Sequence, residues 1–274
     1  MRDLARSLHA TGRPVPVPWR SLANYVRPRT QNLMLVIAAG GVGKSAFALE
    51  WATSLGSPAL YVSLDTSLFD HGVRLLARRT GRSTDEIELG HDDAPKQWAD
   101  KWAPELEDID IPTRFCELTH TARDIHVLVG AETEYWGEAP KLVVVDNLMD
   151  LIEAEEGAGE YRRVLGELKR VAKDHDTLVM VLHHLRRKPP KASKNKDDDE
   201  DDVSTHPVSL DDSMYEGDKQ AQYALGLWRP QWNQLTVGVL KNRMGQARRN
   251  GALHTTLYSD LARMEIRDHT RGAA

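Results

Sequence analysis

One short segment of the sequence has the composition of a phosphate-binding loop. Residues 38–45 read Ala-Ala-Gly-Gly-Val-Gly-Lys-Ser and directly follow the apolar run 33–37. Small residues let backbone N–H groups turn inward around phosphates, and the N-terminus of a following helix favours anions. The segment therefore predicts a nucleoside triphosphate site in which Lys44 reaches the terminal phosphates and the Ser45 hydroxyl binds Mg²⁺.

The loop departs from the usual G-x-x-x-x-G-K-[ST] pattern at its first position, where Ala38 replaces glycine. This change adds only a methyl group, and the glycines nearest the phosphates are kept. The alternative is a glycine-rich turn between a strand and a helix that ends in Lys-Ser without binding a nucleotide. The residues expected to surround ATP are Ala39, Gly40, Gly41, Val42, Gly43, Lys44, Ser45 and Ala46.

Hydrolysis also needs a carboxylate that orients the metal and a base that positions water. Asp146 follows the apolar run 142–145 and is the candidate for the Mg²⁺ shell, although it could instead cap the next segment. Asp65 follows residues 61–64 and is the candidate for the water-activating base. Its alternative role is as the N-cap of a helix that starts near Ser67.

Two further pairs of polar residues stand at predicted strand ends. His183 and His184 end a strand, and because adjacent strand residues point to opposite faces, one of them should face the nucleotide and sense its γ-phosphate. Metal ligation and a plain polar edge are the alternatives. Lys241 and Arg243 share the parity of the apolar residues 237 and 239 and are predicted to project from that face, either into solvent or as a finger toward a neighbouring subunit's triphosphate.

The pattern of the remaining chain indicates how these residues are positioned. Apolar, β-branched runs at 33–37, 59–64, 113–117, 141–145 and 178–182 alternate with helical patterns at 45–54, 68–79, 84–89, 122–135 and 159–173. This alternation predicts an α/β fold with a mainly parallel sheet flanked by helices. Residues 222–228, 235–241, 255–258 and 263–266 predict additional hairpin strands, while 90–110 has no clear assignment.

Two segments stand apart from this alternation. Residues 1–30 are rich in Arg and Pro and predict an N-terminal arm with one short helix near 19–25, before the main domain at 31–274. Residues 186–213 predict a long, mobile, charged loop that begins with a basic block and continues into six acids at 197–202. The cations expected to contact DNA phosphates are Arg186, Arg187, Lys188 and Lys191.

Composition limits the classes of protein that fit. The 274 residues carry a formal net charge of −5, so partner binding must depend on local patches rather than on overall charge. No apolar run is long enough to span a bilayer, and the start of the chain lacks a signal-peptide core. The single cysteine, Cys116, cannot form an internal disulfide, so we expect a cytoplasmic protein, in a host cell if a phage encodes it.

The motifs together resemble the C-terminal, RecA-like ATPase domain of the DnaB-type replicative helicases. The stretches that carry the resemblance are AAGGVGKSAFALEWA, YVSLDTS, KLVVVDNLMDL, LVMVLHHLRR, GDKQAQYALGLWR and LKNRMG, in the family's order. The resemblance implies that ATP and Mg²⁺ bind at Lys44, Ser45 and Asp146. It also implies that Asp65 stands where the family has a catalytic glutamate, His184 where it has a sensor glutamine, and Lys241 and Arg243 where it has a finger acting on the neighbouring subunit.

The same resemblance implies an ATP-dependent DNA motor that forms homo-oligomers, with a hexameric ring as one form, and acts on single-stranded or forked DNA. The family's N-terminal collar domain has no counterpart in these residues, which suits a phage or plasmid replication system. One alternative is a RadA-like or RecA-like recombination ATPase. Another is a structure-specific DNA nuclease on a helicase-like core, with a metal site in the acidic runs 197–202 or 211–212. A third is a nucleotide switch without efficient hydrolysis.

Overall fold

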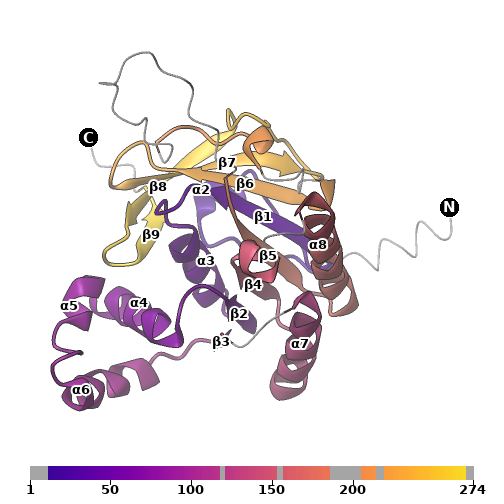
Figure 1. Cartoon of the computed structure of the whole chain (residues 1–274). Coiled ribbons are helices and arrows are strands. Elements are labelled where there is room, and N and C mark those ends of the chain that lie inside the picture. Colours follow the sequence, from indigo (N-terminus) through magenta and orange to yellow (C-terminus); the bar gives the residue numbers. More distant parts are fainter. Residues whose placement is uncertain (1–11, 118–120, 153–156, 186–204, 214–218, 270–274) are drawn as a thin grey trace.

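The computed structural model describes residues 12–117, 121–152, 157–185, 205–213 and 219–269. The described strands form one sheet in the order β3-β2-β4-β5-β1-β6-β7-β8-β9 (Figure 1). Their bounds are β1 Asn32–Ala38, β2 Ala59–Ser63, β3 Thr113–Cys116, β4 Leu142–Asp146, β5 Leu178–His184, β6 Tyr223–Trp228, β7 Gln234–Asn242, β8 His254–Asp260 and β9 Glu265–Asp268.

Strand direction decides which side chains share an edge of this sheet. Strands β1 to β6 run parallel, whereas β7, β8 and β9 join as antiparallel hairpins. The carboxyl ends of β1, β2, β4 and β5 therefore lie at one edge, which is the edge where ligands bind in open α/β sheets. This architecture confirms the expected fold class, including the added C-terminal hairpins.

Helices cover both faces of the sheet. No helix within the described residues is long and apolar enough to cross a membrane. The α-helices are α2 Arg20–Ala23, α3 Lys44–Thr53, α4 Leu68–Thr80, α5 Thr84–Glu88, α6 Pro95–Glu107, α7 Ala122–Trp136 and α8 Gly157–Asp174. Short 3₁₀ turns lie at Leu148–Leu151 and Leu210–Asp212. Helix α3 packs on one face, and α7 and α8 cover the other (Figure 1).

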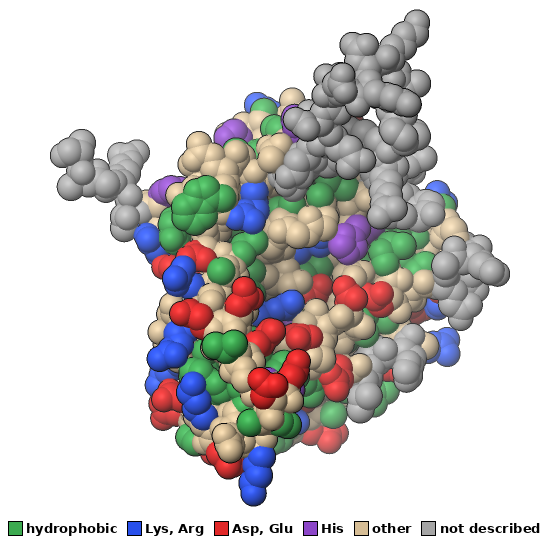
Figure 2. Space-filling view, turned by 60° about the vertical axis from the view of Figure 1, so that its left-hand side comes forward, with side chains coloured by type: hydrophobic (Ala, Val, Ile, Leu, Met, Phe, Trp, Pro, Cys, Tyr) green, Lys and Arg blue, Asp and Glu red, His purple; other side chains and the backbone are tan. Residues whose placement is uncertain are grey.

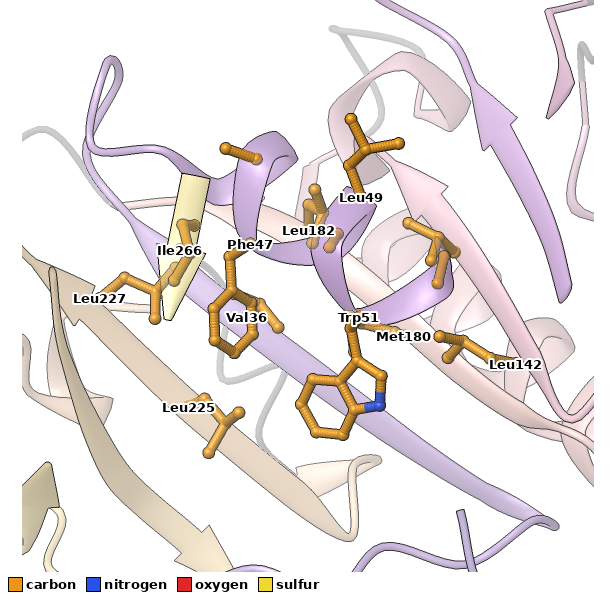
Figure 3. Packing of buried hydrophobic residues seen from close by; sticks show 14 of the residues in the cluster. Val36, Phe47, Leu49, Trp51, Leu142, Met180, Leu182, Leu225, Leu227 and Ile266 are labelled. Carbon is orange, nitrogen blue, oxygen red and sulfur yellow. The ribbon is translucent and has the colours of Figure 1, made fainter. Parts of the chain in front are cut away.

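The core is split by the sheet into two apolar layers. Figure 3 shows the layer on the α3 side, where Phe47 and Trp51 lie against alternate residues of the sheet such as Val36 and Leu225. The intervening residues of the same strands, such as Ile37, belong to the layer under α7 and α8. Burial of both faces explains why these strands read as continuous apolar runs.

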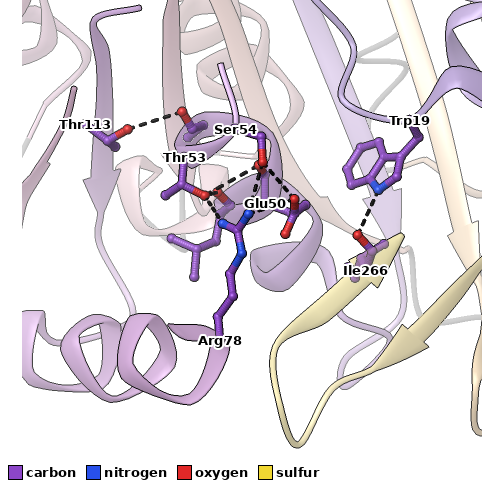
Figure 4. A network of polar contacts seen from close by, with 9 residues as sticks. Trp19, Glu50, Thr53, Ser54, Arg78, Thr113 and Ile266 are labelled. Atoms are coloured by element: carbon purple, nitrogen blue, oxygen red, sulfur yellow. Dashed lines mark hydrogen bonds and ion pairs between the residues drawn. The ribbon is translucent and has the colours of Figure 1, made fainter. Parts of the chain in front are cut away.

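Residues 12–30 pack tightly against the domain. The Trp19 ring is 2% exposed and stacks on Phe47 at a centroid distance of 4.4 Å. Its indole N–H donates to the Ile266 carbonyl of β9 over 3.1 Å (Figure 4). Trp51 in α3 donates to the Pro16 carbonyl over 2.8 Å. The described part of the expected arm therefore joins α3 to the C-terminal hairpin, and the short helix is α2.

Helices α4, α5 and α6 form a projection between β2 and β3 (Figure 1). Arg78 of α4 anchors it to α3 by donating to Glu50 Oε1 over 2.9 Å and to Ser54 Oγ over 3.0 Å (Figure 4). The segment without a clear assignment contains α6, which starts with Pro95 and buries Trp102. Acidic side chains gather over this lower part of the molecule in Figure 2, because residues 83–111 carry ten carboxylates and two lysines.

Candidate nucleotide site

The predicted phosphate loop has the conformation that such a loop requires. It connects β1 to α3, and Gly43 is the N-cap of α3 with a φ of +105°. Gly41 has a φ of +72°, so both positions favour glycine. A Cβ at Gly40 or Gly41 would meet no atom within 4 Å, so space is open above the loop where phosphates would lie.

A pocket of about 300 Å³ opens beside this loop. It brings together residues from the phosphate loop, β2, α4, β4, β5 and the β8–β9 hairpin. Its lining residues are Gly41, Gly43, Lys44, Ser45, Ala46, Asp65, Thr66, Arg74, Asp146, Asn147, His184, Leu261 and Met264. The predicted residues Lys44, Ser45, Asp65, Asp146 and His184 thus meet in one place.

Lys44 is held inside the loop by three acceptors. Its Nζ donates to the carbonyls of Ala38 over 3.1 Å and Ala39 over 2.9 Å, and it lies 3.3 Å from His184 Nδ1. Burial lowers the pKa of this lysine to about 8, although the Asp146 carboxylate works in the opposite direction. A buried cation with a depressed pKa stabilises an incoming polyanion, because the phosphate charges replace the water that the ammonium has lost.

Asp146 ends β4 and is 5% exposed. Its Oδ2 accepts a hydrogen bond from the Tyr61 hydroxyl over 2.7 Å. The next segment is capped by Asn147, whose side chain accepts from Met149 N, so the alternative of Asp146 as the cap is wrong. Its carboxylate therefore lies in the pocket together with Ser45.

Asp65 lines the pocket and is exposed. The N-cap of α4 is Ser67, which forms a capping box with Asp70, so the alternative of Asp65 as the cap is wrong. Asp65 also lies near Asp150, because the charges of Asp65 and Asp146, together with burial as the larger cause, raise the pKa of Asp150. Two carboxylates, those of Asp65 and Asp146, therefore line the pocket, and a third, that of Asp150, is close enough to respond to their charges.

The two histidines at the end of β5 point in opposite directions, as strand alternation predicts. His183 is fully buried against α8, where its Nε2 lies 3.1 Å from the Tyr161 hydroxyl, and burial lowers its pKa to about 3. His184 lines the pocket, and burial, followed by the Lys44 charge, lowers its pKa. Lys44 donates to His184 Nδ1, so the neutral ring carries its proton on Nε2. No group of three metal-ligating side chains exists among the described residues.

Sequence reasoning missed several residues of the pocket. Arg74 comes from the middle of α4, and its Nη1 is buried without a hydrogen-bond partner in the structure. Leu261 and Met264 come from the turn between β8 and β9, and Leu261 approaches Gly43 so closely that a Cβ there would meet Cδ2 at 2.9 Å. The helical spacing that places Arg74 on the same side as His71 was visible in the sequence, but the rotation of α4 was not.

The residues of the pocket fit ATP with Mg²⁺. The open space above Gly40 and Gly41 leaves room for phosphates, and the Lys44 ammonium supplies the compensating charge. Ser45 and Asp146 offer hydroxyl and carboxylate oxygens, which are the ligands that Mg²⁺ takes when phosphates and water complete its shell.

Lys241 and Arg243 lie away from this pocket. β7 is antiparallel to β6, so its end lies at the sheet edge opposite the phosphate loop. A β-bulge between Ala224 and Leu225 in the pairing shifts the register, so that Lys241 pairs with Ala224 and faces α8. The expectation that both cations share the face of Val237 and Val239 is therefore wrong. Both still share a face, since the Arg243 charge contributes to lowering the pKa of Lys169 on α8.

The remaining predicted residues are placed as follows. Arg186, Arg187, Lys188 and Lys191 lie outside the described residues, as does the acidic run 197–202. Asp211 forms an ion pair with Arg249 at 2.7 Å, and the Asp212 side chain accepts from the backbone of Ser209, the N-cap of a 3₁₀ turn. Neither belongs to a group of three metal-ligating side chains among the residues that the structure describes.

Comparison with known proteins identifies the family. A family model described as an AAA domain (AAA_25) matches residues 11–189, from before β1 to the end of β5. The chain belongs to the AAA_25 family. The gene 65 proteins of Mycobacterium phages L5 and D29 are similar to this AAA_25 chain, at 27% identity over 182 residues and 28% over 163 residues. These alignments cover 64% and 56% of the chain and 66% of each phage protein, just under two thirds of their length.

Solved structures show the same fold as this AAA_25 chain. The ATPase domain of G40P superimposes with a TM-score of 0.74 at 17% identity, over 97% of this chain and 96% of that domain. A DnaB-like replicative helicase, described together with its interactions with primase, gives a TM-score of 0.74 at 17% identity over 92% of this chain and 61% of its own. The expected RecA-like fold of DnaB-type ATPase domains is thereby confirmed.

Proposed function

We propose that this AAA_25 chain is a Mg²⁺-dependent ATPase that drives movement on DNA, resembling the motor domain of DnaB-type helicases. The observation that carries the proposal is the convergence of Lys44, Asp65, Asp146 and His184 on one pocket at the mouth of a glycine-rich loop. Lys44 follows the loop after β1, and the other three stand at the ends of β2, β4 and β5; each has the chemistry that phosphoryl transfer needs.

Each residue has a distinct role in this proposal. Lys44 leaves its carbonyl partners to bind the β- and γ-phosphates, and backbone N–H groups of the loop and the N-terminus of α3 bind the remaining phosphate oxygens. Ser45 and Asp146 would hold Mg²⁺, which when bound would supply positive charge against the phosphates. Asp65 orients the attacking water and accepts its proton. His184 donates from Nε2 to the γ-phosphate and reports its presence to residues 186–213.

The site is completed by a second copy of the chain. Lys241 and Arg243 lie at the sheet edge opposite their own phosphate loop, which supports a role on a neighbour's nucleotide rather than on their own. A contact between opposite edges of two copies is head-to-tail, and it generates a ring where the rotation closes. We therefore propose a homo-oligomer, with a hexameric ring as one form. The four cations from Arg186 to Lys191 are proposed to contact DNA phosphates.

The proposal is tested by phosphate release from ATP with Mg²⁺, measured with and without single-stranded DNA, alongside the mass in solution. We expect multiple turnovers, acceleration by DNA, and loss of turnover in Lys44→Ala. Lys96→Ala, which removes an exposed lysine of α6 far from the loop, is the matched control and should retain activity. Turnover that persists in Lys44→Ala would refute the site, and turnover that is indifferent to DNA would refute the motor.

A further inference from the structure

Tyr61 is a buried tyrosine directly beneath the pocket that the roles above do not use. It lies in the middle of β2, where it is fully buried and pairs with Val144 of β4. Its hydroxyl lies 2.7 Å from Asp146 Oδ2 and 3.5 Å from the Ser45 carbonyl. The phenol therefore stands between the two residues that are proposed to hold Mg²⁺.

The direction of the short hydrogen bond follows from charge. A phenol has one proton to donate, and the carboxylate is both nearer and a stronger acceptor than the Ser45 carbonyl. Tyr61 thus donates to Oδ2 of Asp146.

The Tyr61 ring is fixed from two sides. It stacks on Phe115 of β3 at a centroid distance of 5.5 Å and meets the edge of His71 of α4 at 4.8 Å. His71 is itself held, because its Nε2 lies 2.9 Å from Ser63 Oγ. Since neither ring can move without disturbing the core, the hydroxyl has a defined position, and the carboxylate that it binds has a defined orientation.

We infer that Tyr61 is a positioning residue for the metal carboxylate. The hydrogen bond from the phenol to Oδ2 restrains the orientation of the Asp146 carboxylate, so that its other oxygen would be available to the Mg²⁺ shell. This inference rests on the proposed function, because it gives Asp146 its orientation in that same site. The positioning role would make Mg²⁺ binding at Asp146 depend on Tyr61, a side chain that itself contacts neither the nucleotide nor the metal.

The test is the Mg²⁺ dependence of nucleotide binding, which does not require turnover. The affinity of full-length protein for a fluorescent ADP analogue is measured in EDTA and over a Mg²⁺ titration, for wild type and Tyr61→Phe. We expect Tyr61→Phe to bind in EDTA like wild type but to need about tenfold more Mg²⁺, the usual size of an outer-shell effect. Tyr223→Phe is the matched control, since Tyr223 is a buried tyrosine at the opposite edge whose hydroxyl lies 3.4 Å from the Arg27 carbonyl.

A double variant distinguishes a role of Tyr61 in positioning Asp146 from a role in packing alone. If Tyr61 acts through Asp146, then adding Tyr61→Phe to Asp146→Asn should leave the Mg²⁺ requirement of that single variant unchanged. A Tyr61→Phe protein whose Mg²⁺ requirement equals that of wild type overturns the inference, and so does a full additional loss in the Asp146→Asn background. Failure of the proposed function looks different: wild type would then gain no affinity from Mg²⁺, and Lys44→Ala would bind as wild type does.

Discussion

Raising the pH from 7 to 9 is expected to weaken nucleotide binding about tenfold through the deprotonation of Lys44. The pKa of this lysine is lowered to about 8 in the free protein, chiefly by burial. A bound triphosphate favours the cation, so the pKa rises in the complex and binding above pH 8 takes up a proton. Affinity should therefore be constant below the free pKa and fall as the pH rises through it.

The magnitude follows from the fraction of lysine that is already charged. With a pKa of about 8, about 90% of Lys44 is protonated at pH 7 and about 9% at pH 9, so the apparent dissociation constant rises about tenfold. His184 contributes nothing to this change, because burial lowers its pKa below the range of the titration. The phosphates of ATP are fully ionised above pH 7.5, since their last pKa is about 6.

The assay is a titration with a fluorescent, non-hydrolysable ATP analogue at constant ionic strength between pH 7 and 9. Lys44→Arg is the informative companion, because a guanidinium stays charged throughout this range. Its affinity is expected to be lower but independent of pH. A wild-type affinity that does not change across the range, or a pH dependence that persists in Lys44→Arg, would show that Lys44 is not the group that titrates.

Three further predictions concern other parts of the molecule. Arg243→Ala should lower ATP turnover at least about a thousandfold, the usual effect of a missing arginine finger, while nucleotide affinity stays within about twofold of wild type. Normal turnover would refute action in trans. The control is Arg248→Ala, which removes another exposed arginine. Asp65→Asn should lower kcat about a hundredfold or more in steady-state assays, because an amide cannot accept the proton of water, while KM stays the same. Trp19→Ala should destabilise the fold by about 3–5 kcal/mol, since it empties a site that is 2% exposed. Calorimetry should then show a melting temperature roughly 10 °C lower, whereas a melting temperature like that of Trp232→Ala, which removes a 73% exposed ring, would contradict this packing argument.

The parts of the fold that sequence reasoning predicted well are those governed by local pattern. The apolar runs identified five of the six parallel strands, because a strand that is buried on both faces of the sheet is apolar along its length. The segment with α6 was missed because Pro95 and the surrounding acids obscure a helix in which Trp102 is the one buried residue. Helix α6 is stabilised by tertiary contacts, such as the hydrogen bond that the Trp98 indole N–H donates to the Ile87 carbonyl over 2.6 Å. The spacing of apolar residues in the sequence does not predict such contacts.

In the candidate site, too, the residues governed by local pattern were predicted, and those governed by tertiary packing were missed. Lys44, Asp65, Asp146 and His184 stand at loop or strand ends, and parallel strands bring such ends together whatever the details of packing. Tyr61 and Arg74 were missed because their roles depend on which way a ring or a helix faces after packing. The face of Lys241 was predicted wrongly for a related reason. One extra residue in β7 reverses the alternation, and a bulge leaves no clear mark in the sequence.

The contact between Leu261 and Gly43 means that the packing of the phosphate loop depends on the hairpin between β8 and β9. The region matched by the AAA domain model ends at residue 189, yet one wall of the pocket comes from the hairpin turn at Leu261 and Met264. A fragment that stopped at residue 189 would keep the signature lysine and lose the surface that closes the pocket beside it. Because Leu261 packs against Gly43, a displacement of the β8–β9 hairpin is expected to shift the phosphate loop. Nucleotide binding at the loop is in turn expected to shift the hairpin.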